Sequence, residues 1–296
     1  MIPVVVGSSP IGHPSPVFQA VRRAALEQIE TNARGMLGSE DPEFLHQLRV
    51  GMRRLRAALR AFRPILPKKE WGRVRDALRE LSPTLGRARD WDVLVERLNA
   101  ARAAPALIER SQMKRAKARK KALRALGSKK FARLSQTALE PRATSQSLAE
   151  FGAAALERAH RKLVNEARGA DWRNAPRRHA VRIRVKRLRY SCEFFAPAFA
   201  NDETAPYIAQ LKALQETLGE LNDIAVGRRL VGFDADEAAL LSRLEIAWAA
   251  WDATRPFWRA RARRLRPAAR QTRARGSGAR APSGSRRSRK PEARSA

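Results

Sequence analysis

The chain has 296 residues, with 61 Lys and Arg against 29 Asp and Glu, so its formal net charge is +32. At 44% hydrophobic residues it can bury a core, which excludes disorder over most of its length. No uninterrupted apolar run approaches the roughly 18 residues that span a bilayer, so no membrane partner is expected. Because a strongly positive surface attracts polyanions, the composition predicts a soluble, mainly helical protein with a polyanionic partner.

Cysteine and histidine are too scarce and scattered for a structural metal site. The single cysteine, Cys192, cannot form an internal disulfide, and the chain has only four histidines. The opening MIPVVVGSS carries a five-residue apolar run with no basic segment before it, which is shorter than the core of a signal peptide. We therefore expect a cytoplasmic protein that needs no metal and no cofactor.

Apolar residues recur every three or four positions along most of the chain, as on one face of an amphipathic helix. The clearest stripe runs from Leu45 to Phe62, with Asp41 as the expected N-cap, Pro42 in the first turn and Pro64 at the end. No alternating run of β-branched residues competes with this pattern, so the predicted fold class is all-α. The same spacing predicts helices over residues 17–36, 69–81, 90–103, 106–126, 148–167, 175–195, 204–218, 223–231 and 236–265.

Two segments of the chain repeat one another at an offset of 133 residues. HQLRVGMRRLRAALRAFRP begins at His46, and HAVRIRVKRLRYSCEFFAP begins at His179. The identical pairs are His46/His179, Arg49/Arg182, Arg54/Arg187, Leu55/Leu188, Arg56/Arg189, Phe62/Phe195 and Pro64/Pro197, while Arg53/Lys186 keeps a cation. LGRARDWDV from Leu85 and LGELNDIAV from Leu218 recur at the same offset, so the two halves stay in register over more than one helix.

The duplication predicts two antiparallel four-helix bundles related by a pseudo-two-fold axis. We place the first bundle at about residues 16–104, linking basic helices at 105–147 and the second bundle at 148–265. Residues 1–15 are expected to be flexible, and residues 266–296 to form a disordered Arg-rich tail, because Gly, Ser, Pro and Arg leave nothing to bury.

The positive charge is not confined to that tail. Residues 259–296 hold 14 Arg and Lys against one acid, a net of +13, which leaves +19 on the rest of the chain. The body of the protein is therefore basic by itself. The tail is expected to act as a solubilising or accessory electrostatic extension, with a dedicated nucleic-acid arm as the alternative.

Basic side chains form a second stripe beside the apolar one on each repeated helix, at about 100° per residue. The two rows are His46, Arg49, Arg53, Arg56 and Arg60 in the first copy, and His179, Arg182, Lys186 and Arg189 in the second, where Glu193 takes the place of Arg60. Like charges three and four residues apart repel one another, so an anionic ligand would explain the rows. The alternative is a solvated face in an arginine-rich chain, which two copies in register disfavour.

Both repeated segments resemble the motif of CHAD domains, the conserved-histidine α-helical domains, and RARDWDV and ELNDIAV resemble the family's Asp-containing motif. The resemblance spans about residues 16–265. It implies a pair of helical bundles with a basic surface or central pore that binds inorganic polyphosphate without catalysis, through the nine His, Arg and Lys side chains of the two rows. The chain is expected to be a standalone CHAD protein without the triphosphate tunnel (CYTH) domain that often accompanies the family, and to localise with polyphosphate granules.

Two other functions compete with polyphosphate binding. Non-specific nucleic-acid binding, as in a nucleoid-associated protein, fits the net charge. No helix-turn-helix signature, RNP-type aromatic motif or zinc finger is visible, however, and only Tyr190 lies near a basic row as a stacking candidate. A phosphohydrolase is disfavoured because there is no P-loop, activated nucleophile or acid pair suited to Mg²⁺.

Asp90 and Asp223 are expected to cap helices, with orientation of the arginines as the alternative. The six tryptophans are expected to pack in the core.

Overall fold

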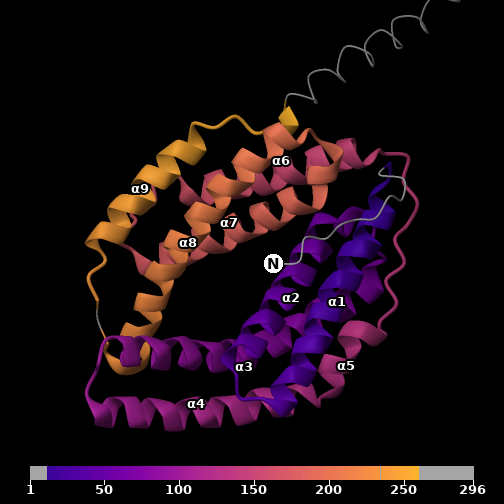
Figure 1. Ribbon diagram of the computed structural model, residues 1–296. Helices are drawn as coiled ribbons and strands as arrows, with labels where there is room; N and C mark the ends of the chain where they lie inside the picture. The colour runs from indigo at the N-terminus through magenta and orange to yellow at the C-terminus, as the bar shows by residue number, and fades with distance from the viewer. Residues whose placement is uncertain (1–11, 234, 260–296) are drawn as a thin grey trace, which may run out of the picture.

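The computed structural model describes residues 12–233 and 235–259, which form nine α-helices and no strand (Figure 1). The all-α prediction is confirmed for this part of the chain. Helices are α1 (Pro14–Gly38), α2 (Pro42–Ala61), α3 (Lys68–Ala100), α4 (Pro105–Leu126), α5 (Lys129–Gln136), α6 (Leu148–Ala167), α7 (Ala175–Phe195), α8 (Asn201–Val231) and α9 (Ala238–Asp252). The predicted Arg-rich tail at 266–296 and residues 1–11 of the predicted flexible N-terminus lie outside the described residues.

Local sequence signals account for the ends of the helices that carry the repeat. At the start of α2, the Asp41 carboxylate accepts a hydrogen bond from the backbone N–H of Glu43 at 2.8 Å, which satisfies one of the free donors of the first turn. Asn174 caps α7 in the same way, through the N–H of Arg177 at 3.0 Å. Each helix then runs into a short 3₁₀ turn that contains the repeated proline, Pro64 or Pro197.

Two pairs of predicted helices are each one long helix, which corrects the expected boundaries. Residues 69–81 and 90–100 belong to α3, which ends three residues before the predicted end at 103, and residues 204–218 and 223–231 belong to α8. Pro83 lies inside α3, yet the buried stripe continues across it from Leu81 to Leu85, so packing on both sides keeps the helix together. The predicted N-cap role of Asp90 and Asp223 is therefore wrong, since both acids lie within a helix.

The helices of each half pack on their neighbours in chain order. In the first half α1 packs on α2, α2 on α3 and α3 on α4, and in the second α6 packs on α7, α7 on α8 and α8 on α9. Figure 1 shows α1–α5 gathered in one part of the molecule and α6–α9 in the other. The predicted linking helices α4 and α5 both pack against α3, so they form part of the first half.

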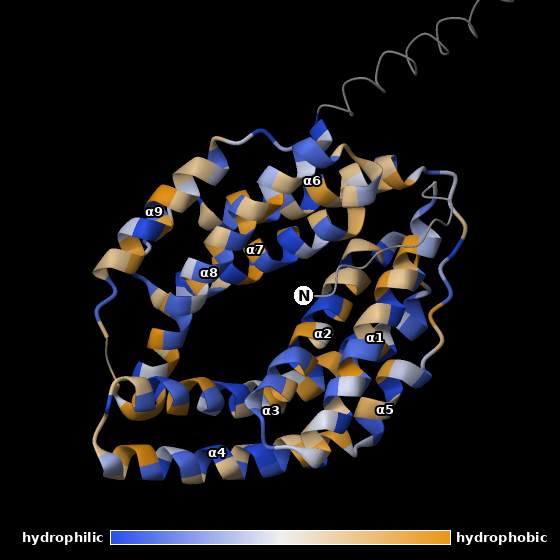
Figure 2. Ribbon diagram, viewed as in Figure 1, coloured by the Kyte–Doolittle hydropathy of each residue, from blue (hydrophilic) through white to orange (hydrophobic). Residues whose placement is uncertain are grey.

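Most helices mix apolar and polar residues along their length, as Figure 2 shows by hydropathy. The apolar sides form one core, which α1, α2, α3, α6, α7 and α8 all share. Tryptophans complete it in the second half, where Trp251 and Trp258 are buried and the Tyr207 ring lies 5.3 Å from the Trp258 ring. The expectation that tryptophans pack rather than face a ligand is confirmed for these two.

The two halves meet mainly at two places, and α1 also contacts α6. The repeated phenylalanines Phe62 and Phe195 lie at the C-terminal ends of α2 and α7, and their ring centroids are 5.0 Å apart. The later turns of α3 and α8 also meet: a Cβ at Gly227 would lie 3.5 Å from a methyl carbon of Leu94. Because helices of each half approach at both places, the middle turns of α2 and α7 and their basic side chains lie close to one another.

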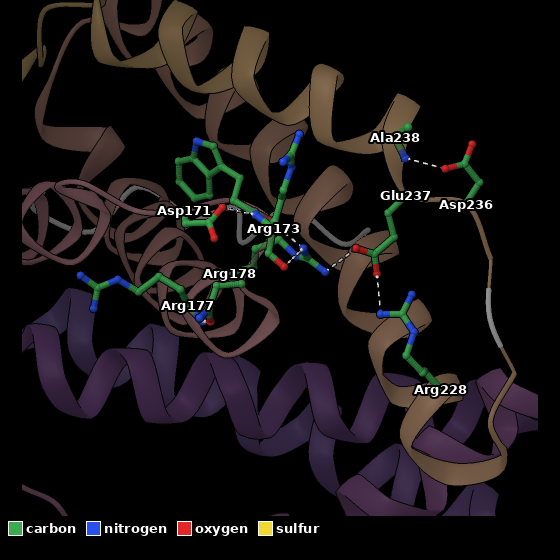
Figure 3. Close-up of polar contacts among 10 residues, drawn as sticks. Asp171, Arg173, Arg177, Arg178, Arg228, Asp236, Glu237 and Ala238 are labelled. Carbon is green, nitrogen blue, oxygen red and sulfur yellow. Dashed lines mark hydrogen bonds and ion pairs between the residues drawn. The ribbon is translucent and has the colours of Figure 1, made fainter.

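A buried ion pair fixes the segment before α9 to the start of α7 (Figure 3). Arg178 donates hydrogen bonds to the carbonyls of Trp172 at 2.7 Å and Arg173 at 3.1 Å, and to the Glu237 carboxylate at 2.8 Å. Arg228 of α8 lies 3.6 Å from the other oxygen of Glu237. Arg178 thus supports the helix that presents the second basic row.

Within the described ranges, no helix is long and apolar enough to cross a bilayer.

Candidate functional site

Four basic side chains from the two repeated helices come together where α2 faces α7. They are Arg49 and Arg53 of α2 and Arg182 and Lys186 of α7, hereafter the central cluster. Each is close enough to the others for the charge of one to lower the pKa of another, and all four are half-buried. The structure thus joins the corresponding members of the two predicted rows in one site, although they lie 133 residues apart in the chain.

Burial and mutual repulsion leave this cluster electrostatically strained. Burial, followed by the charges of Arg182 and Arg53, lowers the pKa of Lys186 to about 6, while Asp223 partly opposes the effect. The pKa of Arg49 falls to about 10, again through burial first and then Arg53. Arginine therefore stays charged at pH 7, whereas the Lys186 amine is mostly neutral until an anion approaches.

The arginines of the cluster carry unused hydrogen-bond donors. The Nε–H groups of Arg49, Arg53 and Arg182 are buried and have no hydrogen-bond partner among the described residues. Leaving a buried donor unpaired costs about 1–3 kcal/mol, and more for a charged group. Three such groups converging from two helices make a site that an acceptor-rich anion would stabilise.

Two repeated acids partly balance this charge, and they do so across the halves. Asp90 of α3 lies 4.0 Å from Arg229 of α8, and Asp223 of α8 lies 3.8 Å from Arg97 of α3. Burial raises the pKa of Asp90, while the charges of Arg49 and Arg229 act in the opposite direction. Because these acids already have arginine neighbours, they reduce the charge of the central cluster without cancelling it.

A glycine of the second repeated motif makes room for Arg49. A Cβ at Gly86 would lie 2.9 Å from a terminal guanidinium nitrogen of Arg49, so a side chain here would push the guanidinium away. At the equivalent Gly219 a Cβ would meet nothing within 4 Å. The repeated glycine therefore has a packing reason in the first half only.

The two predicted histidines stand at the N-terminal ends of the rows, in different surroundings. Burial, then Arg89, lowers the pKa of His46, to which Arg53 and Lys186 also contribute. His179 is exposed, and its Nδ1 lies 2.8 Å from the side-chain oxygen of Asn222. Since Arg89 and Asn222 are equivalent positions of the duplication, each histidine faces the same position of the neighbouring long helix.

Three predicted row members lie away from the central cluster. Arg56 donates to the Leu78 carbonyl at 2.8 Å and to the Ser82 hydroxyl, whereas Arg189 donates to Gln215 at 2.9 Å and to Glu193. Ser82 and Gln215 are again equivalent, so this repeated arginine joins each repeated helix to the next long helix. Arg60, further along α2, lies instead beside Arg184 and Arg187.

Reasoning from the repeat also missed functional neighbours. Arg97 and Arg229 pair with the repeated acids but do not occupy equivalent positions, so the offset of 133 residues carries no signal for them. Arg89 could have been found, because it directly precedes Asp90 in the second motif. Its importance depends on the approach of α3 to His46.

The site offers cations and donors rather than metal ligands or an activated nucleophile. No group of three or more His, Cys, Asp or Glu among the described residues is arranged to hold a metal ion. Asp92 is buried but pairs with Arg115 of α4 at 2.7 Å. Burial raises the pKa of the Cys192 thiol well above its usual value, which disfavours the thiolate. Cations and free donors of this kind are suited to the electrostatic binding of an anion.

Fold and site define an all-α protein of two helical halves with a cationic cluster between them. The model of the CHAD domain matches residues 20–232, and the chain belongs to the CHAD family, which is associated with polyphosphate binding. The resemblance of the two repeated motifs to this family is thereby confirmed.

Solved structures support the same assignment. The crystal structure of the CHAD domain from the plant Ricinus communis is 31% identical in sequence, covers 83% of this chain and 89% of its own, and superposes with a TM-score of 0.62. PptA from Streptomyces chartreusis shares the fold: it is 20% identical, the match covers 80% of this chain and 97% of PptA, and the TM-score is 0.53.

The uncharacterized protein Rv2226 from Mycobacterium tuberculosis strain H37Rv is 28% identical over 246 residues. The chain spans 46% of the length of that relative, which covers 75% of this chain.

Proposed function

We propose that the protein binds inorganic polyphosphate without hydrolysing it, and that binding brings it to polyphosphate granules. The observation that carries the proposal is the central cluster, in which three half-buried arginines have buried Nε–H donors without a partner among the described residues. Polyphosphate is a flexible chain with about one negative charge per phosphate, which rows of cations can bind without reading any base. Guanidinium groups suit it because they stay charged and donate parallel hydrogen bonds to phosphate oxygens.

The proposed contacts are shared between the two repeated helices. His46, Arg49 and Arg53 of α2, together with His179, Arg182 and Lys186 of α7, are assigned to the polymer. Arg56 and Arg189 are assigned to holding the long helices in place, because protein groups already accept their hydrogen bonds. An anion beside Lys186 favours its protonated form, so binding at neutral pH is accompanied by proton uptake.

We propose that the protein is not catalytic because the acids near the cluster already have arginine neighbours. Asp90 and Asp223 each lie near an arginine of the opposite half, and Asp92 is bonded to Arg115. A Mg²⁺-assisted phosphohydrolase needs carboxylates that are free to hold the metal. These three acids are better suited to setting the arginines in place.

Non-specific nucleic-acid binding is the second candidate, and the net charge of +32 favours it. The aromatic residue nearest to the second row does not support base stacking. Tyr190 is 5% exposed, and the guanidinium of Arg189 lies 4.4 Å from its ring centroid. Base stacking contributes much of the affinity for single strands, so a cluster without an open ring favours a polymer of phosphates alone.

Competition binding at physiological salt tests the two candidates against each other. Labelled long-chain polyphosphate bound to the full chain is challenged with duplex DNA and single-stranded RNA at matched phosphate concentration, since at low salt every polyanion binds. The chain lacking residues 268–296 serves as the second sample. We expect polyphosphate to stay bound in a large excess of both competitors in both samples. Displacement at parity would transfer the assignment to nucleic acid.

A further inference from the structure

A second group of cations surrounds a cavity of about 330 Å³ between α2, α6 and α7, hereafter the side pocket. Its walls are partly made of small residues, Ala57, Ala61, Ala155 and Ala159, with Ser191 and Trp71. The basic lining residues are Arg60, Arg63, Arg158, Lys162, Arg184 and Arg187. No Asp or Glu of the described ranges lines it. Its volume lies at the lower end of that of small-molecule sites.

The side pocket is distinct from the central cluster. On α7, Arg187 is about 100° round the helix from Lys186, and Arg184 and Ser191 share its side. The charges that lower the pKa of Arg187, to about 10, are those of Arg60, Arg184 and Arg56, after burial. The charges that affect Lys186 are those of Arg182, Arg53, Asp223 and Arg49. The cations that act on Arg187 therefore differ from those that act on Lys186.

The charge of the side pocket is only weakly balanced by its neighbours. Glu166 of α6 accepts a hydrogen bond from Arg184 at 3.1 Å and lies 4.0 Å from Arg177. Arg187 is half-buried, and its Nε–H is buried without a partner among the described residues. This unpaired donor on a charged side chain is the same feature that marks the central cluster, here with six cations around one cavity.

The walls indicate which anion fits. The ring of Trp71 is already covered by guanidinium groups, with Arg63 4.3 Å and Arg75 4.7 Å from its centroid. Its Nε1–H donates to the Leu59 carbonyl at 2.9 Å. A nucleobase therefore finds no free ring to stack on. The small alanine side chains leave the space open, and the guanidinium groups around it supply hydrogen-bond donors for the oxygens of a small anion.

We propose that the side pocket is a second anion site, which holds an inorganic oligophosphate of a few phosphate units. The duplication does not repeat this pocket, because two of its cations have no basic counterpart in the other copy. Gly51 is the equivalent of Arg184, and Glu193 is the equivalent of Arg60. The site therefore goes beyond the paired rows of the proposed function. Its ligand is either free tripolyphosphate or the end of a longer polyphosphate chain, which have the same chemistry.

Calorimetric titration of the full chain with tripolyphosphate tests the side pocket. The variant Arg158→Gln/Lys162→Gln removes two exposed cations from its rim, and Arg161→Gln/Arg168→Gln removes the same charge from the same end of α6 outside the pocket. We expect the first variant to weaken one class of tripolyphosphate site by about tenfold or more, as for lost charge-assisted hydrogen bonds, and the second to leave it unchanged. Equal titrations for the two variants would overturn the proposal.

A third variant separates this site from the central cluster. Arg53→Gln/Lys186→Gln should leave the side-pocket class of tripolyphosphate binding intact, and its loss there would show one continuous site and overturn the proposal. Long-chain polyphosphate identifies the source: weaker binding by Arg158→Gln/Lys162→Gln than by its control supports entry of a chain end, and equal binding supports a free ligand. If long chains fail to bind the wild-type protein while tripolyphosphate does, the proposed function fails and the side pocket stands.

Discussion

The two halves of the molecule agree where they face each other and differ at the flanks of the rows. Arg49 and Arg182 both reach the central cluster from equivalent positions. At the flank, the second half neutralises its own cation, since Glu193 pairs with Arg189, whereas the first half has Arg60 at that position. The first half therefore carries more uncompensated charge, as the replacement of Arg60 by Glu193 in the second motif indicates. A duplicated motif identifies the shared centre of a site but not how strongly each copy contributes.

The largest expected effect comes from removing the shared centre. Replacing Arg49, Arg53, Arg182 and Lys186 by Ala should weaken polyphosphate binding by about 100-fold or more at physiological salt, because several charge-assisted contacts disappear together. Helicity measured by circular dichroism should change little. Deletion of residues 268–296 is the comparison, and should weaken binding only modestly. Complete loss of binding on that deletion would place the site in the tail instead.

The next effect concerns stability rather than binding. Arg189→Met should lower the free energy of unfolding by about 2 kcal/mol, because Glu193 and Gln215 lose their partner in a largely buried setting. Arg56→Met should cost about 1 kcal/mol, since the Ser82 hydroxyl keeps its bond to the Leu78 carbonyl. Both are measured by chemical denaturation, with the exposed Arg79→Met as control. Weaker polyphosphate binding at unchanged stability would make Arg189 a ligand contact.

A smaller effect follows from the protonation of Lys186. Its pKa of about 6 in the free protein leaves the amine mostly neutral at pH 8, and a bound polyanion raises that pKa. Affinity should therefore rise by about tenfold as the pH falls from 8 to 6, and should stop rising below the pKa of the free protein. Lys186→Arg should reduce this rise, because arginine stays charged throughout. Titration of the two proteins at several pH values measures this, and equal slopes would contradict it.

The smallest expected effect addresses the difference between the halves directly. Asn222→Arg gives the second half the cation that Arg89 supplies in the first, and should raise polyphosphate affinity by about two- to threefold, as expected of one further exposed charge. Ser242→Arg, which adds the same charge on the exposed side of α9, is the control. Equal affinity for the two variants would show that the halves respond to net charge alone.

The sequence predicted where helices occur better than where one helix ends and the next begins. The bounds of α6 and α7 match the predicted ranges because caps and apolar spacing are local signals. The breaks predicted within α3 and α8 do not exist, because packing on both sides of Pro83 and around Asp223 outweighs local propensity. That error also misplaced Asp90, which faces Arg49 and Arg229 from within α3 rather than capping a helix.

By itself, the sequence determined that the protein is helical, duplicated and basic, and that two rows of cations occupy equivalent helix faces, since periodicity and repeats are properties of the chain alone. Tertiary structure decided which cations of a row act together. Arg53 and Arg56 differ by three residues on one basic face, yet Arg53 faces the other half while Arg56 is bonded to α3. Helix spacing cannot separate them, because the distinction depends on where Phe62 meets Phe195 and on how the long helices cross.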